Sequence, residues 1–277
     1  MTKTAAPMTS GSIWKQMTFF AMPIFLGNLF QQLYNTVDSL IVGNFLGSSA
    51  LAAVSSSGSL IFMLIGFLSG SSAGAGVIVA RFFGAGDEKN LQRAVHTTVA
   101  FGLVAGVLMT GVGVALSPQI LRWMDTPESV MRESVTYLQI YFAGSLGFVM
   151  YNVLVGILQA VGDSRHPLYY LIVSSVINLV LDLLFITGFH TGVGGAAVAT
   201  VISQIVSALL CFWQLLRTKE SYGLKIRKIR FDKGILVQII KIGLPSGVQN
   251  SIIAFANVVV QSNINAFGEM ADRKSVV

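Results

Sequence analysis

The sequence has 277 residues, of which 53% are hydrophobic and 11% are charged, and its formal net charge is +6. Soluble domains contain about 25% charged residues, and the mean hydropathy here is +0.72. This composition excludes an ordinary soluble domain and indicates an all-α protein that crosses a membrane several times. The single cysteine, Cys211, lies inside an apolar run, so it cannot form an intrachain disulfide and is expected to be buried.

Seven apolar stretches are each long enough to cross a bilayer as a helix, which satisfies its own backbone hydrogen bonds in lipid. They occupy residues 14–43, 52–80, 92–116, 134–160, 168–189, 194–216 and 236–267. Within the second stretch, Gly66, Gly70 and Gly74 recur every four residues, a spacing that lets two membrane helices approach closely. The sequence therefore predicts a polytopic helix bundle with one tight, glycine-lined crossing.

Basic residues are distributed unevenly among the connections between these stretches. Fourteen of the eighteen lysines and arginines lie at the N-terminus or in the second, fourth and sixth connections, and eight of them fall between Arg217 and Lys241. Because positively charged connections stay in the cytoplasm, this pattern predicts a cytoplasmic N-terminus and a multi-pass protein of the plasma (inner) membrane. The KIRKIR segment, Lys225–Arg230, is interpreted as a topology determinant and a contact with the lipid surface, not as a nucleic-acid site.

The seventh stretch resembles the first. Met22–Phe45 aligns with Leu244–Phe267 at a constant offset of 222 residues, which places Pro23 on Pro245. Repeated halves with a site between them are typical of transporters, and about five further spans would complete the second half. We expect residues 1–216 to form a six-helix N-terminal lobe, 217–235 a basic cytoplasmic linker, 236–270 the first helix of a truncated second lobe, and 271–277 a non-native tail.

Two carboxylates, Asp38 and Asp182, lie well inside apolar stretches. Asp38 is the last of four polar residues that share one helical stripe through spacings of three, four and three. The other three are Asn28, Gln31 and Asn35. A polar stripe that faced lipid would be costly, so this one is expected to face the bundle interior or a water-filled cavity.

The second carboxylate has polar neighbours of its own. Asn178 lies four residues before Asp182 on the same helix face, and Thr200 lies in the next stretch, which a short connection makes an antiparallel neighbour. Carboxylate, amide and hydroxyl oxygens are hard ligands that suit Na⁺, and a carboxyl group in an apolar setting can carry a proton. The pattern predicts a site for Na⁺ or H⁺; the alternative is a structural, hydrogen-bonded and neutral pair of carboxyl groups.

Other polar residues offer no chemistry. His96, His166 and His190 lie in or near connections without ligand spacing and are expected to be solvated. Asp163, in GDSRHP, is expected to form a turn at a cytoplasmic helix end. GVGGAA, residues 192–197, fits a loose dinucleotide-binding pattern, but it lies between two membrane spans and is interpreted as a chance match.

Taken together, these motifs resemble those of multidrug and toxic compound extrusion (MATE) transporters, over about residues 13–270. Asp38 in NTVD matches the family's first-helix aspartate, and Asn178 and Asp182 in NLVLD match its fifth-helix pair. Thr200 in GGAAVAT matches its sixth-helix threonine, and Asn152 resembles a fourth-helix cavity amide. Gly162, Asp163 and Pro167 in GDSRHP resemble its cytoplasmic turn. The pattern is closest to the prokaryotic branch with a cation site in the first lobe.

The resemblance implies a twelve-helix fold in two six-helix lobes that exports amphipathic, often cationic drugs in exchange for Na⁺ or H⁺. The expected cation-coupling residues are Asp38, Asp182, Asn178 and Thr200, and the expected substrate-cavity residues are Gln31, Tyr34, Asn35 and Asn152. No catalytic residue and no cofactor beyond the coupling ion are expected, so the protein is not interpreted as an enzyme. The expected partners are the small-molecule substrate, the lipid bilayer and the missing second lobe.

Three alternatives remain open. A lipid-linked oligosaccharide flippase of the same superfamily would need cationic cavity residues for its pyrophosphate, and none is evident inside the first-lobe spans. An intramembrane aspartyl protease also needs two membrane aspartates, but Ala160 replaces the first glycine of its G-x-G-D signature and Asp163 lies at the boundary of the membrane. The third is a non-transporting half-protein that pairs with another copy.

Overall fold

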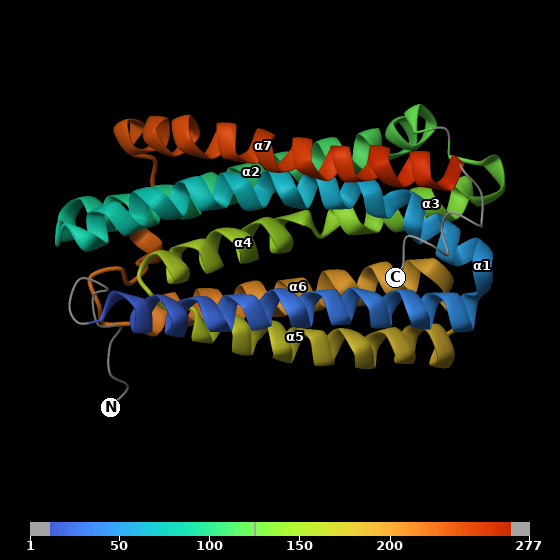
Figure 1. The fold of residues 1–277 in the computed structure, drawn as a ribbon, viewed down its shortest axis with the longest axis horizontal. Coiled ribbons are helices and arrows are strands. Elements are labelled where there is room, and N and C mark those ends of the chain that lie inside the picture. The colour runs from blue at the N-terminus through green and yellow to red at the C-terminus, as the bar shows by residue number, and fades with distance from the viewer. Residues whose placement is uncertain (1–11, 125, 267–277) are drawn as a thin grey trace.

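The computed structural model describes residues 12–124 and 126–266, and within these ranges the fold is all-helical. The helices are α1 (Ile13–Gly84), α2 (Glu88–Trp123), α3 (Glu128–Ala143), α4 (Ser145–Ala160), α5 (Arg165–Leu183), α6 (Gly192–Arg217) and α7 (Lys233–Ala266), with a π-helical turn η1 (Leu184–Gly188) after α5 and a 3₁₀ turn η2 (Ile226–Lys228) before α7. The long helices run roughly lengthwise in the view of Figure 1. The tail predicted at residues 271–277 lies outside the described residues.

The predicted membrane bundle is confirmed in its class. Among the described residues, five helical segments are long and apolar enough to cross a membrane, and the bent α3–α4 pair makes a sixth candidate. The first part of α1 is not among these segments, because its glutamines, asparagines and aspartate lower its hydropathy. Each of the seven predicted stretches nevertheless coincides with a helix, a pair of helices or one arm of a helix.

The first two predicted spans form the two arms of α1. Gly47 interrupts the helix with φ 87° and ψ 179°, a conformation that glycine reaches without a side-chain clash. The first arm, residues 13–46, and the second arm, residues 48–84, therefore run in opposite directions from this break (Figure 1). Asp38 lies in the first arm, about two to three helical turns before the break.

The fourth predicted span is not a single straight helix beginning at residue 134. It is the pair α3 and α4, which begins at Glu128 and bends by 49°. Gly144 lies at the bend, where a Cβ atom would come within 2.3 Å of the Val201 side chain. The missing side chain thus lets α6 pack directly against the bend.

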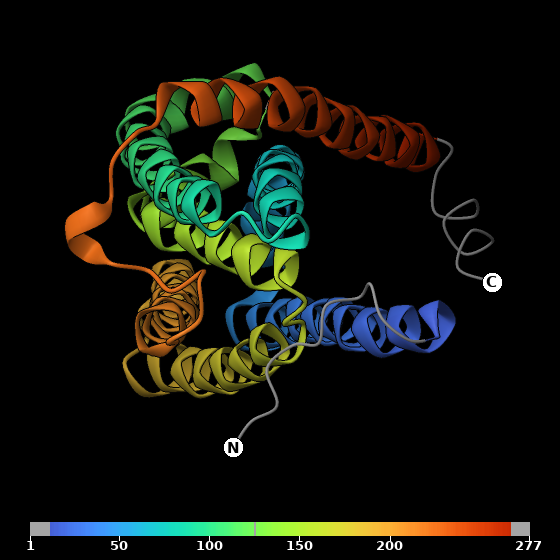
Figure 2. The same cartoon turned by 90° about the vertical axis from the view of Figure 1, so that its left-hand side faces the viewer.

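The predicted glycine crossing is confirmed, and its partner is α7. A Cβ atom on Gly74 would lie 2.2 Å from Gly243 Cα, and one on Gly70 would lie 2.6 Å from Gly247 Cα. The second arm of α1 and the first half of α7 therefore touch through their backbones. Figure 2, which looks along the helices, shows α7 lying across one side of the bundle and α5 on the opposite side.

The prediction for His96 is wrong, because this side chain is only 3% exposed. The connection between α6 and α7 folds back over the start of α2 and covers it. His190 is exposed as expected, and His166 pairs with Asp163, whose Oδ1 accepts the His166 backbone N–H at 3.2 Å. That bond supports the predicted turn at the start of α5, and Cys211 is fully buried as predicted.

Candidate functional site

Three helical segments place the predicted cation-coupling residues at one end of the bundle. Asp38 comes from the first arm of α1, Asn178 and Asp182 from the last two turns of α5, and Thr200 from the first half of α6. The short connection between α5 and α6 makes these helices neighbours, and the first arm of α1 packs along α5. A π-helical turn, η1, follows Asp182 directly, and such turns are frequent at functional sites.

The two carboxyl groups are in contact. The side chains of Asp38 and Asp182 interact with each other. A hydrogen bond between two carboxyl groups requires a proton on one of them. Asp182 is fully buried and Asp38 is partly buried. The Oδ1 atom of each is shielded from solvent without a hydrogen-bond partner among the described residues. A buried acceptor in this state is costly, so each Oδ1 is a ready ligand for a cation or a proton.

Asn178 connects this pair to α6. In the orientation that we assign, its amide nitrogen donates to Asp182 Oδ2, one turn farther along α5, at 2.8 Å. Its carbonyl oxygen accepts the Thr200 backbone N–H of α6 at 3.2 Å. We assign this orientation because the opposite one would set the amide oxygen against a carboxylate. The Thr200 side chain also forms a hydrogen bond with Tyr34. All four predicted coupling residues, and Tyr34 with them, therefore belong to one network.

Sequence reasoning missed two tyrosines of α3 beside this network. Tyr137 is 5% exposed and interacts electrostatically with both Asp38 and Asp182, and Tyr141 lies next to Tyr137 and Tyr34. Their signal in the sequence is a spacing of four residues, which puts both rings on one helix face. Aromatic residues at that spacing in an apolar stretch are ordinarily core residues, so the sequence alone does not single them out.

A small polar pocket lies on the same inner face of α1, toward the other end of the bundle. Its volume is about 250 Å³, and both arms of α1, together with α4 and α5, line it. Asn28, Gln31 and Asn152 are among its lining residues, and none of the described residues that line it is a lysine or an arginine. Asn152 Nδ2 donates to Phe148 O at 2.9 Å, which fixes the amide at the wall.

The four predicted substrate-cavity residues therefore do not line a single pocket. Gln31 and Asn152 line the polar pocket, whereas Tyr34 belongs to the carboxylate network. Asn35 is exposed and does not line this pocket. Among the residues that the structure describes, no three His, Cys, Asp or Glu side chains cluster as they would around a transition metal. The oxygen atoms of the network belong to two carboxyl groups, an amide and hydroxyl groups.

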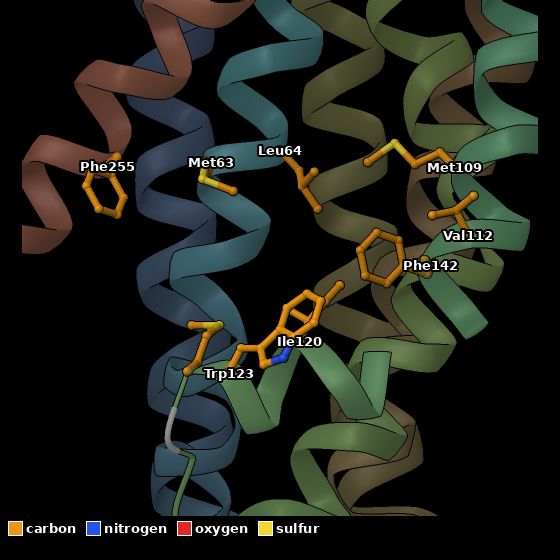
Figure 3. Close-up of a pocket in the computed structure, with 10 residues that line it drawn as sticks. Met63, Leu64, Met109, Val112, Ile120, Trp123, Phe142 and Phe255 are labelled. Carbon is orange, nitrogen blue, oxygen red and sulfur yellow. The ribbon is translucent and has the colours of Figure 1, made fainter. Parts of the chain in front are cut away.

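A larger pocket of about 670 Å³ is apolar and lies apart from these residues (Figure 3). The second arm of α1, α2, α3 and α7 line it. Figure 3 shows Met63 and Met109 with Trp123, Phe142 and Phe255 around it. Flexible methionine and flat aromatic side chains adapt to apolar groups of many shapes, but none of the predicted coupling or cavity residues lines this pocket.

Comparison with known proteins agrees with this architecture. The MatE family model matches residues 23–184. The chain is 34% identical over 267 residues to the probable multidrug resistance protein YoeA of Bacillus subtilis (strain 168), with 94% of this chain and 58% of that protein covered. The chain therefore spans a little more than half the length of such relatives.

Solved structures resemble the same region. The outward-facing conformation of a multidrug resistance MATE family transporter of the MOP superfamily superposes with a TM-score of 0.84 at 27% identity, covering 91% of this chain and 56% of that one. A transporter of the MOP superfamily from Pyrococcus furiosus, described as having a binding pocket of reverse polarity that suggests a different function, has a TM-score of 0.83 at 28% identity, covering 91% of this chain and 56% of that one. On the family model, the sequence identity and the shared fold, the chain belongs to the MATE family.

Proposed function

We propose that this chain is part of a cation-coupled (Na⁺ or H⁺) antiporter that exports amphipathic, often cationic drugs or toxic compounds across the plasma membrane. The observation that carries the proposal is the contact between Asp38 and Asp182 inside an apolar helix bundle. Two adjacent carboxyl groups at membrane depth repel each other when both are ionised. Either one of them binds a proton, or a cation binds between them and offsets their charge. Such a pair suits a site that takes up a cation on one side of the membrane and releases it on the other.

The network offers a role for each residue. As the transported ion, H⁺ would be shared by the two carboxyl groups, whereas Na⁺ would be held by their oxygens together with those of Asn178 and Thr200. Asn178 keeps Asp182 in position from α5, and the Tyr34–Thr200 hydrogen bond ties α1 to α6. A change of charge at Asp38 would therefore alter the contacts among α1, α5 and α6.

The polar pocket is the proposed site for the polar part of the substrate, with Gln31 and Asn152 in its wall and Asn35 and Tyr34 on neighbouring turns. Among the described residues, its lining contains no cationic side chain, which favours a cationic or neutral substrate over a pyrophosphate-linked lipid. Gln31 and Asp38 lie on one face of the first arm, about 10 Å apart along its axis. We infer that this arm links substrate binding to cation binding.

Transport as a whole is proposed for the complete protein. The matched multidrug relatives are longer, since the chain covers 58% and 59% of the first two. We infer that a second lobe, which begins with α7, closes the transport path opposite the first lobe, and that the N-terminus lies in the cytoplasm. The repeat of the first span in α7 supports this arrangement.

The test is efflux of ethidium, a cationic dye, from proteoliposomes that contain the product of the complete gene. An imposed H⁺ or Na⁺ gradient is expected to drive efflux, and Asp38→Asn and Asp182→Asn should each reduce the driven rate at least about tenfold, which corresponds to about 1.4 kcal/mol. Glu133→Gln is the control, because it removes an exposed carboxylate from α3. Efflux at the normal rate in Asp38→Asn would refute the coupling role, and movement of a pyrophosphate-linked lipid without dye efflux would favour the flippase.

A further inference from the structure

The connection between α6 and α7 is held rigidly against the first lobe by its backbone. His96 Nε2 accepts the Lys225 backbone N–H at 3.0 Å, and Gln92 Nε2 donates to Gly223 O at 3.1 Å. Further along, Thr97 Oγ1 accepts the Asp232 backbone N–H at 3.1 Å. All three anchoring side chains come from the first turns of α2, so both ends of the segment are fixed to one helix.

Side chains on the inner side of this connection strengthen the attachment. Tyr222 and Leu224 are buried in the main hydrophobic core, and Ile229 packs against that core. Asp232 forms an ion pair with Arg93 of α2, with 3.8 Å between Oδ2 and Nη1. A loop with buried apolar anchors and satisfied backbone groups keeps one shape.

The outer side of the same segment is basic and apolar. We define the linker surface as the exposed side chains of Lys225, Ile226, Arg227, Lys228, Arg230 and Phe231. Ile226 is 60% exposed and Phe231 is 47% exposed. No described residue forms a hydrogen bond or an ion pair with the four cationic side chains of this surface. The segment therefore presents its charge outward on a backbone that is already ordered.

The position of this surface indicates what it meets. η2 projects sideways beyond the surrounding helices at the end of the bundle where α6 ends and α7 begins (Figure 2). In the last turn of α6, the Arg217 guanidinium lies 4.6 Å from the ring centre of Trp213, which is half exposed. Tryptophan and arginine at a helix end mark the level of lipid headgroups. A surface that projects sideways at this level lies over headgroups.

We propose that the linker surface is a preformed docking site for anionic phospholipid headgroups in the leaflet at this end of the bundle. Four cations within six residues match the phosphates of an anionic lipid surface, and the flanking Ile226 and Phe231 can enter the region just below them. Because α7 begins directly after this segment, bound lipid holds the start of α7 in place. Nucleic acid offers phosphates too, but it gives the two exposed apolar side chains no apolar medium.

The first experiment measures lipid binding to the purified complete protein by native mass spectrometry, with phosphatidylglycerol and phosphatidylcholine as probes. Wild type is expected to retain phosphatidylglycerol at least about tenfold better than phosphatidylcholine, since clustered cations near the membrane surface attract anionic lipids. A quadruple Gln variant at Lys225, Arg227, Lys228 and Arg230 should lose most of that preference. The matched control is a quadruple Gln variant at Arg81, Lys89, Arg165 and Lys219, four exposed cations outside the linker surface.

Equal loss in the two quadruple variants would overturn the proposal, because it would mean that overall charge decides retention. Equal retention of both lipids by wild type would overturn it as well. Binding of a single-stranded oligonucleotide in preference to phosphatidylglycerol vesicles would replace the lipid by nucleic acid.

A second experiment does not depend on the folding of a fourfold variant. A spin label is placed at Ile226→Cys, with Cys211 fully buried and so not labelled. In nanodiscs with phosphatidylglycerol, the label is expected to become more accessible to oxygen and less accessible to a water-soluble nickel complex than in pure phosphatidylcholine. High salt should reverse this shift, since it screens surface charge. A label that stays equally water-accessible in both lipids refutes the proposal.

Discussion

His96 holds the connection between α6 and α7 through its ring nitrogens and needs no charge to do so. We assign the tautomer in which Nε2 carries no proton, because Nε2 then accepts the Lys225 backbone N–H at 3.0 Å. The ring proton then lies on Nδ1, which donates to Gln92 O. A neutral imidazole therefore satisfies one backbone N–H and one backbone carbonyl at once.

Replacing His96 by alanine is expected to loosen the whole connection. The variant leaves the partly buried Lys225 N–H without its acceptor, and an unsatisfied donor shielded from water costs about 1–3 kcal/mol. Hydrogen–deuterium exchange with mass spectrometry should show faster exchange across residues 221–232. His190→Asn is the control, because His190 is exposed and has a φ of 51°, which asparagine tolerates. Unchanged exchange in His96→Ala would show that the other anchors suffice.

Helix geometry explains why the polar stripe of the first arm faces two environments. Each residue turns a helix by about 100°, so residues seven apart differ by only about 20°. Gln31 and Asp38 form one such pair and are partly buried, whereas Asn28 and Asn35 form the other and are exposed, with Asn28 still at the edge of the polar pocket. The sequence predicts a polar face, but only packing against α5 decides which edge of that face turns inward.

The membership of the carboxylate network could be predicted only in part. Spacing alone pairs Asn178 with Asp182, and the short connection brings Thr200 close. That Asp38 touches Asp182 depends on how the first arm crosses α5, which no local pattern encodes. The role of Tyr137 depends on the same crossing, because its ring meets the carboxylates from α3.

At the scale of helices, the crossing between the second arm of α1 and α7 depends on glycine on both sides. The carbonyl oxygen of Ser71 would lie 2.8 Å from a Cβ atom on Gly243, and that of Phe67 would lie 2.7 Å from one on Gly247. These obstacles are backbone atoms, which cannot turn away as a flexible side chain can. Ser251 Oγ adds a hydrogen bond to Met63 O at 3.3 Å farther along the same pair of helices.

Gly74→Ala is therefore expected to destabilise the protein. Its new Cβ atom would meet Gly243 Cα at 2.2 Å, and overpacking of this kind costs about 1–3 kcal/mol. The melting temperature in detergent should fall by several degrees. Gly58→Ala is the control on the same arm, because a Cβ atom there has no neighbour within 4 Å. Equal melting temperatures for the two variants would rule out close contact at this crossing.

The positions of the helices were easier to predict than their breaks. Length and apolarity predict seven spans because lipid imposes both on any crossing helix. Gly144 lies at the bend and packs against Val201 of α6, and the π-helical turn after Asp182 also departs from a regular α-helix. Such breaks depend on the packing of neighbouring helices, so a glycine inside a predicted span does not by itself predict a break in the helix.

At the scale of the whole molecule, charge separates the two ends of the bundle. The end that holds the connection between α6 and α7 also carries Arg81, Lys89 and Arg165, whereas Arg122 and Arg132 lie at the end with the Gly47 break. Figure 1 shows these ends at opposite sides of the molecule. This asymmetry supports a proposed orientation with the linker end in the cytoplasm.

Labelling with a membrane-impermeant maleimide tests this orientation. Arg132→Cys should react in right-side-out membrane vesicles, and Lys228→Cys should react only in inside-out vesicles, because a spanning bundle keeps its two ends on opposite sides. Both positions are exposed, and the native Cys211 is fully buried, so the unsubstituted protein serves as the blank. The reverse pattern would mean that the basic end faces outward against the positive-inside rule. Reaction of both cysteines from the same side would contradict the spanning arrangement itself.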